Sequence, residues 1–438
     1  MRKKLALFAV VMLLLCVLLG GNAFFGFIER FADTGTATQG ADEKKQTALA
    51  QTGAEYPAPG TAPYETASNG TAMSGGTGGA GYNGDTGDSG AAWSGAALAD
   101  TGGAESREQE PWMQMPGGAE PGAIKTVNIA GEDDGPEIIE IVISAAGDCT
   151  LGGDIRLGPN GFMQELQRQD NNYRYFLKNV YPIFRKDDLT IANMEGTFAS
   201  AGPHKSNEFI ISGPPELVEV FTSSGVDVVT IANNHTMDYL QKGYDETVAV
   251  LDEAGLPYFG NEYTALIDVK GIKIGLFGYS MPQAGADKDK ITKNISRLRE
   301  EGADIVIAYY HWGIEREYYP NANQKAIARH TIDSGADLVL GAHPHVLQGI
   351  EEYKGKNIVY SLGNFCFGAN RNPFDKDTMI YQHSFVFSEG ELIESRYRII
   401  PCSISSVKDR NNYQPTPLEG AEAERVLTKL EQLSSTLY

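Results

Sequence analysis

The chain has 438 residues, which is enough for one large domain or two ordinary domains with additional segments. Asp and Glu number 57 against 36 Lys and Arg, so the formal net charge is −21 at pH 7. This balance excludes a non-specific nucleic-acid binder, because contacts to phosphates need clustered cationic side chains. Hydrophobic residues make up 42% of the chain, so we expect a substantial buried core.

The N-terminus combines a basic tip with a long apolar run. Three basic residues lie in 1–4, and the apolar stretch 5–28 contains Asn22 as its only strongly polar member. A run of this length can span a bilayer, and basic residues favour the cytoplasmic side. We therefore predict a cytoplasmic tip at 1–4, a transmembrane signal anchor at 5–28, and a single-pass cell-membrane protein with its main domain extracellular. A cleaved, secreted form stays open, because residues 21–23 resemble a signal-peptidase site.

Residues 29–136 are dominated by Gly, Ala, Ser and Thr with scattered acidic residues. Such a segment buries too little apolar area to offset its chain entropy, which predicts a disordered tether. The tether would hold the following domain away from the membrane. A dispensable low-complexity insert is the alternative.

From residue 137 onward, apolar β-branched runs alternate with amphipathic segments. Strands are expected at 138–143, 188–192, 226–232, 272–279, 304–310, 337–340, 356–362, 379–387 and 391–400. Helices are expected at 173–184, 214–223, 240–253, 290–301, 323–334 and 418–433, and hairpin turns at 270–271 and 354–355. This order predicts an α/β fold of layered sheets flanked by helices rather than a simple doubly wound sheet. We place this domain at 137–401, followed by a C-terminal extension with a helix at 402–438.

Four cysteines are too few for a disulfide framework. Cys16 lies in the predicted membrane span, and Cys149, Cys366 and Cys402 follow it. Buried free thiols are the interpretation we favour for these three. A bridge between Cys366 and Cys402 stays open, because an extracellular location permits disulfides.

Six polar clusters each follow a short apolar run. In chain order they are Gly147-Asp148, Asn193-Met194-Glu195, Asn233-Asn234-His235, His311-Trp312-Gly313, His343-Pro344-His345 and Ser361-Leu362-Gly363-Asn364. A buried strand that ends in a polar loop places reactive side chains at one edge of a sheet. The repetition therefore predicts a single site assembled from distant segments.

The side chains of these clusters are oxygen and imidazole donors, which suit Mn, Zn, Fe or Mg rather than soft metals. Four of the seven histidines lie in them, at positions 235, 311, 343 and 345. His343 and His345 are separated only by Pro344, so their imidazoles can face the same site. The concentration of histidines predicts a divalent metal site, with one or two ions, or a phosphate site.

The segment 233–238 also contains a candidate acid. An Asn carbonyl oxygen can ligate a metal while the neighbouring imidazole of His235, oriented by Asp238, donates a proton to a leaving group. These two residues are our catalytic candidates. The alternative is an Asn-rich turn that caps the following helix, and both roles are compatible.

Taken in order, the six clusters and their flanking residues resemble the CapA (PgsA) family of poly-γ-glutamate capsule synthesis proteins over roughly 137–401. The resemblance implies a calcineurin-like metallophosphoesterase fold, a two-sheet sandwich flanked by helices (α/β/β/α). It also implies an extracellular protein that works at the membrane with membrane-bound polymer synthase subunits and an anionic glutamate polymer.

The resemblance further implies a set of metal ligands, namely Asp148, Asn234, His311, His343 and His345. Two positions depart from the phosphoesterase pattern. Thr150 stands where the pattern has a histidine, and the segment 193–195 stands where a Gly-Asp pair supplies a bridging carboxylate. Glu195 is the candidate replacement for that carboxylate, and binding of one metal ion or none stays open.

Five further residues are candidates for substrate contact: Asn193, Asn233, Trp312, Glu315 and Asn364. Packing is the alternative for Trp312, because aromatic residues near strand ends often lie in the core. Glu315 is either an orienting group for His311, a partner for an arginine, or a solvated acid.

Three functions remain open at this point. The first is an anchored protein of polymer synthesis or export that carries the metal site. The second is a metal-dependent hydrolase of a phosphoester or of a cell-envelope polymer bond. The third is a non-catalytic module that binds the polyanion or scaffolds a synthase.

Overall fold

The computed structural model describes residues 137–157, 161–199, 201–206 and 209–437. The predicted tip, anchor and tether, at 1–4, 5–28 and 29–136, lie outside these residues. Within the described part of the chain, no helix is both long enough and apolar enough to cross a membrane.

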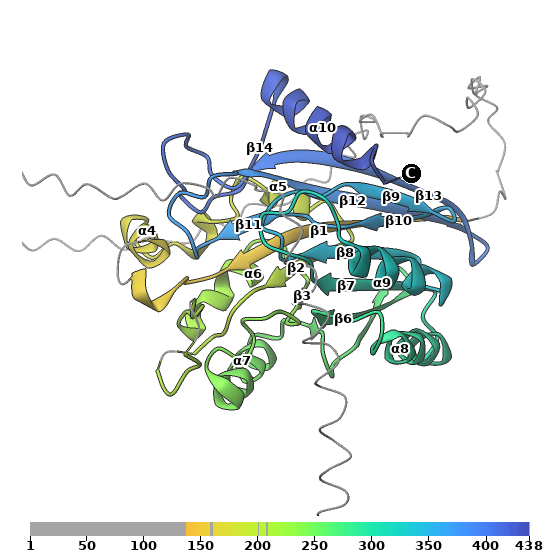
Figure 1. The fold of residues 1–438 in the computed structure, drawn as a ribbon, viewed down its shortest axis with the longest axis horizontal. Coiled ribbons are helices and arrows are strands. Elements are labelled where there is room, and N and C mark those ends of the chain that lie inside the picture. The colour runs from red at the N-terminus through yellow and green to blue at the C-terminus, as the bar shows by residue number, and fades with distance from the viewer. Residues whose placement is uncertain (1–136, 158–160, 200, 207–208, 438) are drawn as a thin grey trace, which may run out of the picture. The chain divides into compact units, whose positions relative to one another are not determined.

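Two mixed β-sheets form the centre of the domain (Figure 1). The strands of the first sheet, in spatial order, are β14 (Thr416–Pro417), β13 (Glu391–Ser403), β12 (Asp377–Ser388), β1 (Ile138–Thr150), β2 (Leu189–Met194), β3 (Val228–Thr230) and β4 (Tyr258–Phe259), with β11 (Asn364–Phe367) paired to β1. The second sheet has the order β5 (Ala265–Val269), β6 (Ile272–Ser280), β7 (Ile305–His311), β8 (Leu338–Ala342), β10 (Lys356–Val359) and β9 (Ile350–Tyr353). The strands β1 to β4 are parallel, and so are β6, β7, β8 and β10.

Seven α-helices are present among the described residues. They are α4 (Phe162–Arg168), α5 (Tyr181–Phe184), α6 (Glu219–Thr222), α7 (Leu240–Ala254), α8 (Lys288–Glu300), α9 (Ala322–Asp333) and α10 (Gly420–Ser434). The four longest match predicted helices. The prediction of one continuous helix at 173–184 is wrong. That segment forms a 3₁₀ turn at Tyr173–Tyr175 and then α5. Pro182 explains the break, because proline lacks the N–H that a continuing helix needs and favours the first helical turn.

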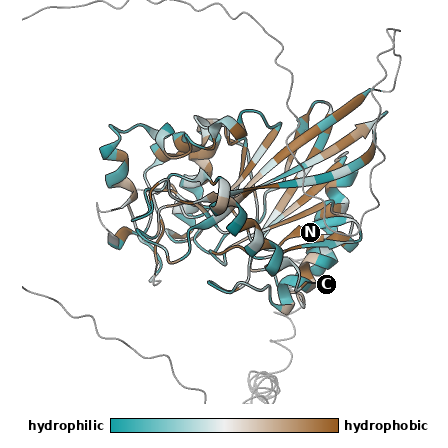
Figure 2. Ribbon diagram, turned by 90° about the horizontal axis from the view of Figure 1, so that it is seen from above, coloured by the Kyte–Doolittle hydropathy of each residue, from teal (hydrophilic) through white to brown (hydrophobic). Residues whose placement is uncertain are grey.

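Buried apolar side chains form three main layers. One lies between the sheets and includes Ile143, Ile307 and Leu340. A second packs the outer face of the first sheet against α4 to α7, and a third packs the outer face of the second sheet against α8 and α9. Figure 2 shows the apolar strands inside and the hydrophilic helix surfaces outside. The predicted two-sheet sandwich flanked by helices is confirmed.

The segment after residue 401 is continuous with this domain. β13 runs through that position to Ser403, and β14 pairs with it. From α10, Val426, Leu430 and Leu433 enter the layer between the sheets. Residues 402–437 thus complete the core rather than extend from it.

The apolar runs of β1 and β11 meet closely at Gly147. A Cβ atom there would lie 1.9 Å from the carbonyl oxygen of Gly363, the same oxygen that accepts from the Asp148 amide at 3.0 Å. We expect Gly147→Ala to destabilise the domain by roughly 3 kcal/mol, because overpacking forces the backbone apart. Urea unfolding measures the loss. Gly285→Ala is the control, since nothing lies within 4 Å of a Cβ at Gly285, and equal stability of the two variants would contradict this account.

Candidate metal centre

The parallel strands of both sheets bring the predicted residues to one edge. Asp148 lies near the end of β1, and Glu195 follows β2 directly. His311 is the last residue of β7, and His343 follows β8. All four side chains are buried, with exposures between 0% and 5%. The strand-end rule therefore accounts for how distant segments meet in one place.

The donor atoms of this cluster lie within a few ångströms of one another. His345 Nδ1 is 3.1 Å from Asp148 Oδ2, and His311 Nε2 is 3.5 Å from Glu195 Oε1. His311 Nε2 also lies 3.0 Å from His343 Nδ1 and 2.7 Å from Asn234 Oδ1. Three overlapping groups each place their ligand atoms within 4.8 Å: Glu195, His311 and His343; Glu315, His343 and His345; Asp148, Glu195 and His345. The structure thus brings together all six predicted metal ligands.

The strongest indication of a bound cation is a set of unpartnered oxygens. Both carboxylate oxygens of Glu195 are buried and have no hydrogen-bond partner, and the same holds for Asn193 Oδ1. The amide nitrogen of Asn193 lies 2.7 Å from Asp148 Oδ1 and 3.1 Å from His311 Nδ1. A buried carboxylate without donors is costly, and a cation among these atoms would remove that cost. The residues present therefore fit a divalent metal.

The pKa values of the cluster diverge for physical reasons. Burial and the nearby Asp148 carboxylate raise the pKa of Glu195 to about 7. Burial lowers the pKa of His345, but the Glu195 and Asp148 carboxylates outweigh it and raise that pKa to about 9. Burial and neighbouring imidazoles lower the pKa of His343 to about 4 and that of His311 well below its usual range. Two imidazoles are thus held neutral, which is the form that binds a metal.

The backbone around the two paired histidines is strained. His343 has φ +94° and His345 has φ +57°, a region that side chains other than glycine rarely adopt. The His343 amide donates to Asp148 Oδ2 at 3.2 Å and helps fix this conformation. Strain of this kind costs about 1–3 kcal/mol per residue and concentrates at functional sites.

Because of this strain, a glycine variant at position 343 should be more stable than an alanine variant, the reverse of the usual order of stability. In metal-free protein we expect His343→Gly to be more stable than His343→Ala by about 1 kcal/mol, because only glycine relaxes at this φ. Chemical denaturation in the presence of a chelator measures the difference. At His330 in the helix α9, the same pair should show alanine as the more stable by about 1 kcal/mol. The same order at both positions would rule out strain at His343.

The catalytic candidates also form a close pair. His235 Nδ1 lies 2.7 Å from Asp238 Oδ2, which accepts from the Ile211 amide at 2.8 Å. Neither His235 nor Asp238 caps α7, because the N-cap residue is Tyr239 and no side chain bonds to that helix end. Burial lowers the pKa of His235, but the hydrogen bond to Asp238 and the Glu195 charge raise it above its ordinary value. The imidazole is therefore oriented and biased toward its protonated, proton-donating form.

Removing the Asp238 carboxylate should make the His235 imidazole less readily protonated. We expect Asp238→Asn to lower the pKa of His235, because the hydrogen-bonded charge is lost while the burial remains. Nuclear magnetic resonance titration of the His235 ring in metal-free protein gives the value directly. Asp245→Asn, an exposed change on α7, is the control and should leave the His235 pKa unchanged. A pKa equal to or above the wild-type value in Asp238→Asn would contradict the pairing.

The candidates for substrate contact have different surroundings. Trp312 is 1% exposed, lies in the core beside α9 and donates to the carbonyl oxygen of Tyr360 at 2.9 Å. The indole is enclosed by packing, which favours the packing alternative for this residue. Glu315 is exposed, and its carboxylate lies within 4.8 Å of ligand nitrogens of His343 and His345. Asn364 Oδ1 lies 2.8 Å from His345 Nδ1, and Asn233 donates to the carbonyl oxygen of Met194 at 2.8 Å.

The position that departs from the phosphoesterase pattern has a structural role. Thr150 is 1% exposed, and its hydroxyl accepts from the Ala369 amide at 3.0 Å. Cys149, next to Asp148 in the sequence, lies in the core layer between the first sheet and the helices α4 to α7. Burial raises the pKa of its thiol to about 12. It is free, as are Cys366 and Cys402, so the interpretation of three buried thiols is confirmed.

The sequence analysis did not identify one group of residues that lies near the cluster. A pocket beside Asn234 is also lined by Lys205, Asn261, Glu262 and Ser280. Ser280 ends β6, so the strand-end rule could have included it. Lys205 and Glu262 lie in loops without a recognisable motif.

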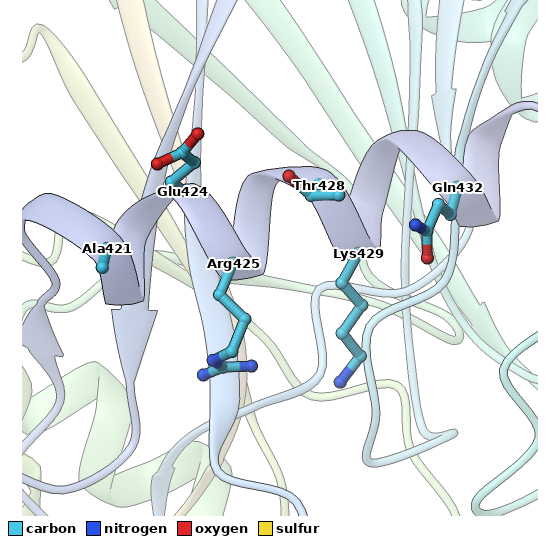
Figure 3. A pocket seen from close by; sticks show the side chains of 6 residues that line it. All are labelled: Ala421, Glu424, Arg425, Thr428, Lys429 and Gln432. Carbon is cyan, nitrogen blue, oxygen red and sulfur yellow. The ribbon is translucent and has the colours of Figure 1, made fainter.

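Another pocket lies on the surface of α10 (Figure 3). Its cationic side chains, Arg425 and Lys429, extend to the same side of the helix. They form ion pairs with Asp377 at 2.7 Å and with Asp375 at 2.6 Å. Because these charges are already neutralised, we assign this pocket no ligand.

These features define the class of protein: an α/β/β/α two-sheet domain with a buried cluster of histidine, carboxylate and amide ligands at one sheet edge. The model of the family described as bacterial capsule synthesis protein PGA_cap matches residues 142–369. The chain belongs to this family, and the resemblance noted from the six clusters is confirmed.

Similar proteins come from Bacillus. The chain is 32% identical over 279 residues to the PGA biosynthesis protein CapA of Bacillus subtilis (strain 168), covering 58% of this chain and 70% of the relative. It is 30% identical over 263 residues to the capsule biosynthesis protein CapA of Bacillus anthracis, covering 53% of this chain and 63% of the relative, just under two thirds. A 5'-nucleotidase from Candida albicans SC5314 aligns at 12% identity over 68% of this chain and 57% of that chain, with a TM-score of 0.36. That likeness is too distant to assign an activity.

Proposed function

We propose that this chain acts in poly-γ-glutamate biosynthesis or export at the cell surface, through a divalent metal held by the buried cluster. Its Bacillus relatives are named for capsule and PGA biosynthesis. The single observation that carries the metal is the unpartnered Glu195 carboxylate beside His311 and His345.

The cluster supplies six ligands for that metal: Asp148, Glu195, Asn234, His311, His343 and His345. A metal held there would supply Lewis-acid polarisation of a carbonyl or phosphoryl oxygen. Manganese, zinc, iron and magnesium are all compatible with oxygen and imidazole donors. The protein itself keeps the imidazoles of His311 and His343 neutral and leaves the Glu195 carboxylate without a hydrogen-bond donor, so that these groups can bind the metal.

We place the domain outside the cell. Residues 5–28 would anchor the chain in the membrane, and the tether at 29–136 would extend the domain toward membrane-bound synthase subunits and the anionic polymer. Fractionation of cells with an antibody to the domain tests this placement. Recovery in the membrane fraction is expected, and recovery in the medium supports the cleaved form.

The cell experiment replaces the chromosomal gene in a host that makes the polymer. We expect the double variant His343→Ala, His345→Ala to lower surface poly-γ-glutamate at least about tenfold, because two metal ligands are removed. The variant His330→Gln, on α9 and away from the cluster, is the matched control and should make the wild-type amount. Wild-type polymer from a double variant that accumulates normally would contradict the proposal.

A second candidate is a metal-dependent hydrolase, which the His235 and Asp238 pair favours. In that case the purified protein with Mn or Zn turns over a phosphoester or a γ-glutamyl amide. His235→Gln then lowers the turnover without lowering the metal content. A panel of such substrates on which the protein is inert would remove this candidate, and polymer binding that survives a chelator would favour the non-catalytic module.

A further inference from the structure

A polar pocket of about 440 Å³ adjoins the cluster. It is bounded by the loops after β3 and β4, the end of β6, the first turns of α7, and Lys205 from the segment after β2. Asn234 belongs to both places, since it lines the pocket while its Oδ1 lies 2.7 Å from His311 Nε2. The volume is in the range of small-molecule sites, about 300–1,000 Å³. A ligand in the pocket would therefore lie next to the metal ligands.

The pocket presents one charge of each sign. Lys205 is half-buried and Glu262 is exposed, and both line it. Within the described residues no acidic side chain forms an ion pair with Lys205. A fully anionic ligand would meet the carboxylate of Glu262, whereas a ligand that carries both charges satisfies both side chains.

A buried tyrosine hydroxyl also lines the pocket. Tyr244, on α7, is 5% exposed, and its hydroxyl lies next to the Glu262 carboxylate. Burial and the hydrogen bond to the Glu262 carboxylate raise the pKa of Tyr244, so the hydroxyl keeps its proton and can hold that carboxylate in place. Asn261 and Ser280 add an amide and a second hydroxyl to the lining. These groups suit a ligand with a carboxylate and further polar atoms.

We propose that this pocket binds the amino-terminal residue of a γ-linked glutamate chain, with Lys205 holding its α-carboxylate and Glu262 holding its α-ammonium group. This assignment rests on the proposed function. In a γ-linked chain every residue keeps a free α-carboxylate, but only the amino-terminal residue also keeps a free α-ammonium group. The two charges of the pocket thus select the chain end, and the shared Asn234 places that end beside the metal centre.

Isothermal titration calorimetry of the purified full-length protein tests the assignment with two probes, γ-glutamylglutamate and its N-acetyl form. Acetylation should weaken binding at least tenfold, because the ammonium charge is lost. Lys205→Met should weaken both probes at least tenfold. Glu262→Gln should weaken only the unmodified dipeptide. Tyr244→Phe should also weaken the unmodified dipeptide, several-fold, because the hydroxyl that holds Glu262 in place is lost.

Two matched variants serve as controls. Lys273→Met and Glu253→Gln make the same charge changes at exposed positions on β6 and α7 outside the pocket, and both should bind as the wild type does. Equal binding of the two probes, wild-type binding by Lys205→Met, or displacement of the dipeptide by an equal concentration of inorganic phosphate would each overturn the assignment. So would a lack of dipeptide binding in protein that retains its metal and supports polymer formation in cells, which leaves the proposed function standing.

Discussion

Replacing Glu195 by glutamine is expected to weaken divalent metal binding at least about 100-fold, because the variant loses a buried carboxylate ligand. The same change should make the metal-free protein more stable. Burial and the Asp148 charge raise the pKa of Glu195 to about 7, so the ionised carboxylate opposes folding above that pH. Affinity and stability thus move in opposite directions.

The stability difference between Glu195→Gln and the wild type should depend on pH in a definite direction. A carboxyl group whose folded pKa is raised binds more protons in the folded state, so stability falls as pH rises from the unfolded value near 4.5 through about 7. Glu195→Gln removes this loss, and its advantage in metal-free protein should be present at pH 8 and absent at pH 4. Urea unfolding at both pH values measures it, with the exposed change Glu216→Gln as control. A Glu195→Gln variant that binds metal as the wild type does would remove Glu195 from the site.

Metal affinity is expected to rise steeply with pH. The metal competes with protons on the cluster that contains Glu195 and His345, whose pKa values are raised to about 7 and about 9. Below pH 7 binding releases about two protons, between pH 7 and 9 about one, and above pH 9 none. The affinity should therefore increase about 100-fold per pH unit in the first range and about tenfold per unit in the second.

Calorimetry in two buffers of different ionisation enthalpy counts the protons directly. In Glu195→Gln the release below pH 7 should fall by about one proton, because the group that titrates near pH 7 is gone. His311 and His343 should contribute none at these pH values, since burial keeps them neutral. An affinity that stays constant between pH 6 and 9 is incompatible with these ligands.

The sequence patterns located the fold well where periodicity and strand ends carry the information. The runs before Asp148, His311 and His343 were recognisable as buried strands, and parallel strands necessarily place their ends together. The helix predicted at 173–184 failed because propensity did not weigh the effect of Pro182. The assignment of residues after 401 to an extension also missed that α10 contributes Leu430 to the main core, a contact between segments far apart in the sequence.

The site was predictable in its ligands but not in its surroundings. Residue type and the family resemblance together marked the six candidate metal ligands, whereas the enclosure of Trp312, which follows β7, depends on packing against α9 that the sequence pattern does not show. The left-handed backbone at His343 and His345 is not visible in residue type either. Lys205 and Glu262 reach the neighbouring pocket from separate loops, and only the folded arrangement brings opposite charges together there.

The most direct test of the central claim is the metal content of the purified full-length protein after dialysis, measured by elemental analysis. We predict at least one tightly held divalent ion per chain in the wild type and less than one tenth of that amount in the His343→Ala, His345→Ala variant. Wild-type protein that folds, accumulates normally and retains no Mn, Zn, Fe or Mg would contradict the assignment of this cluster as a metal centre.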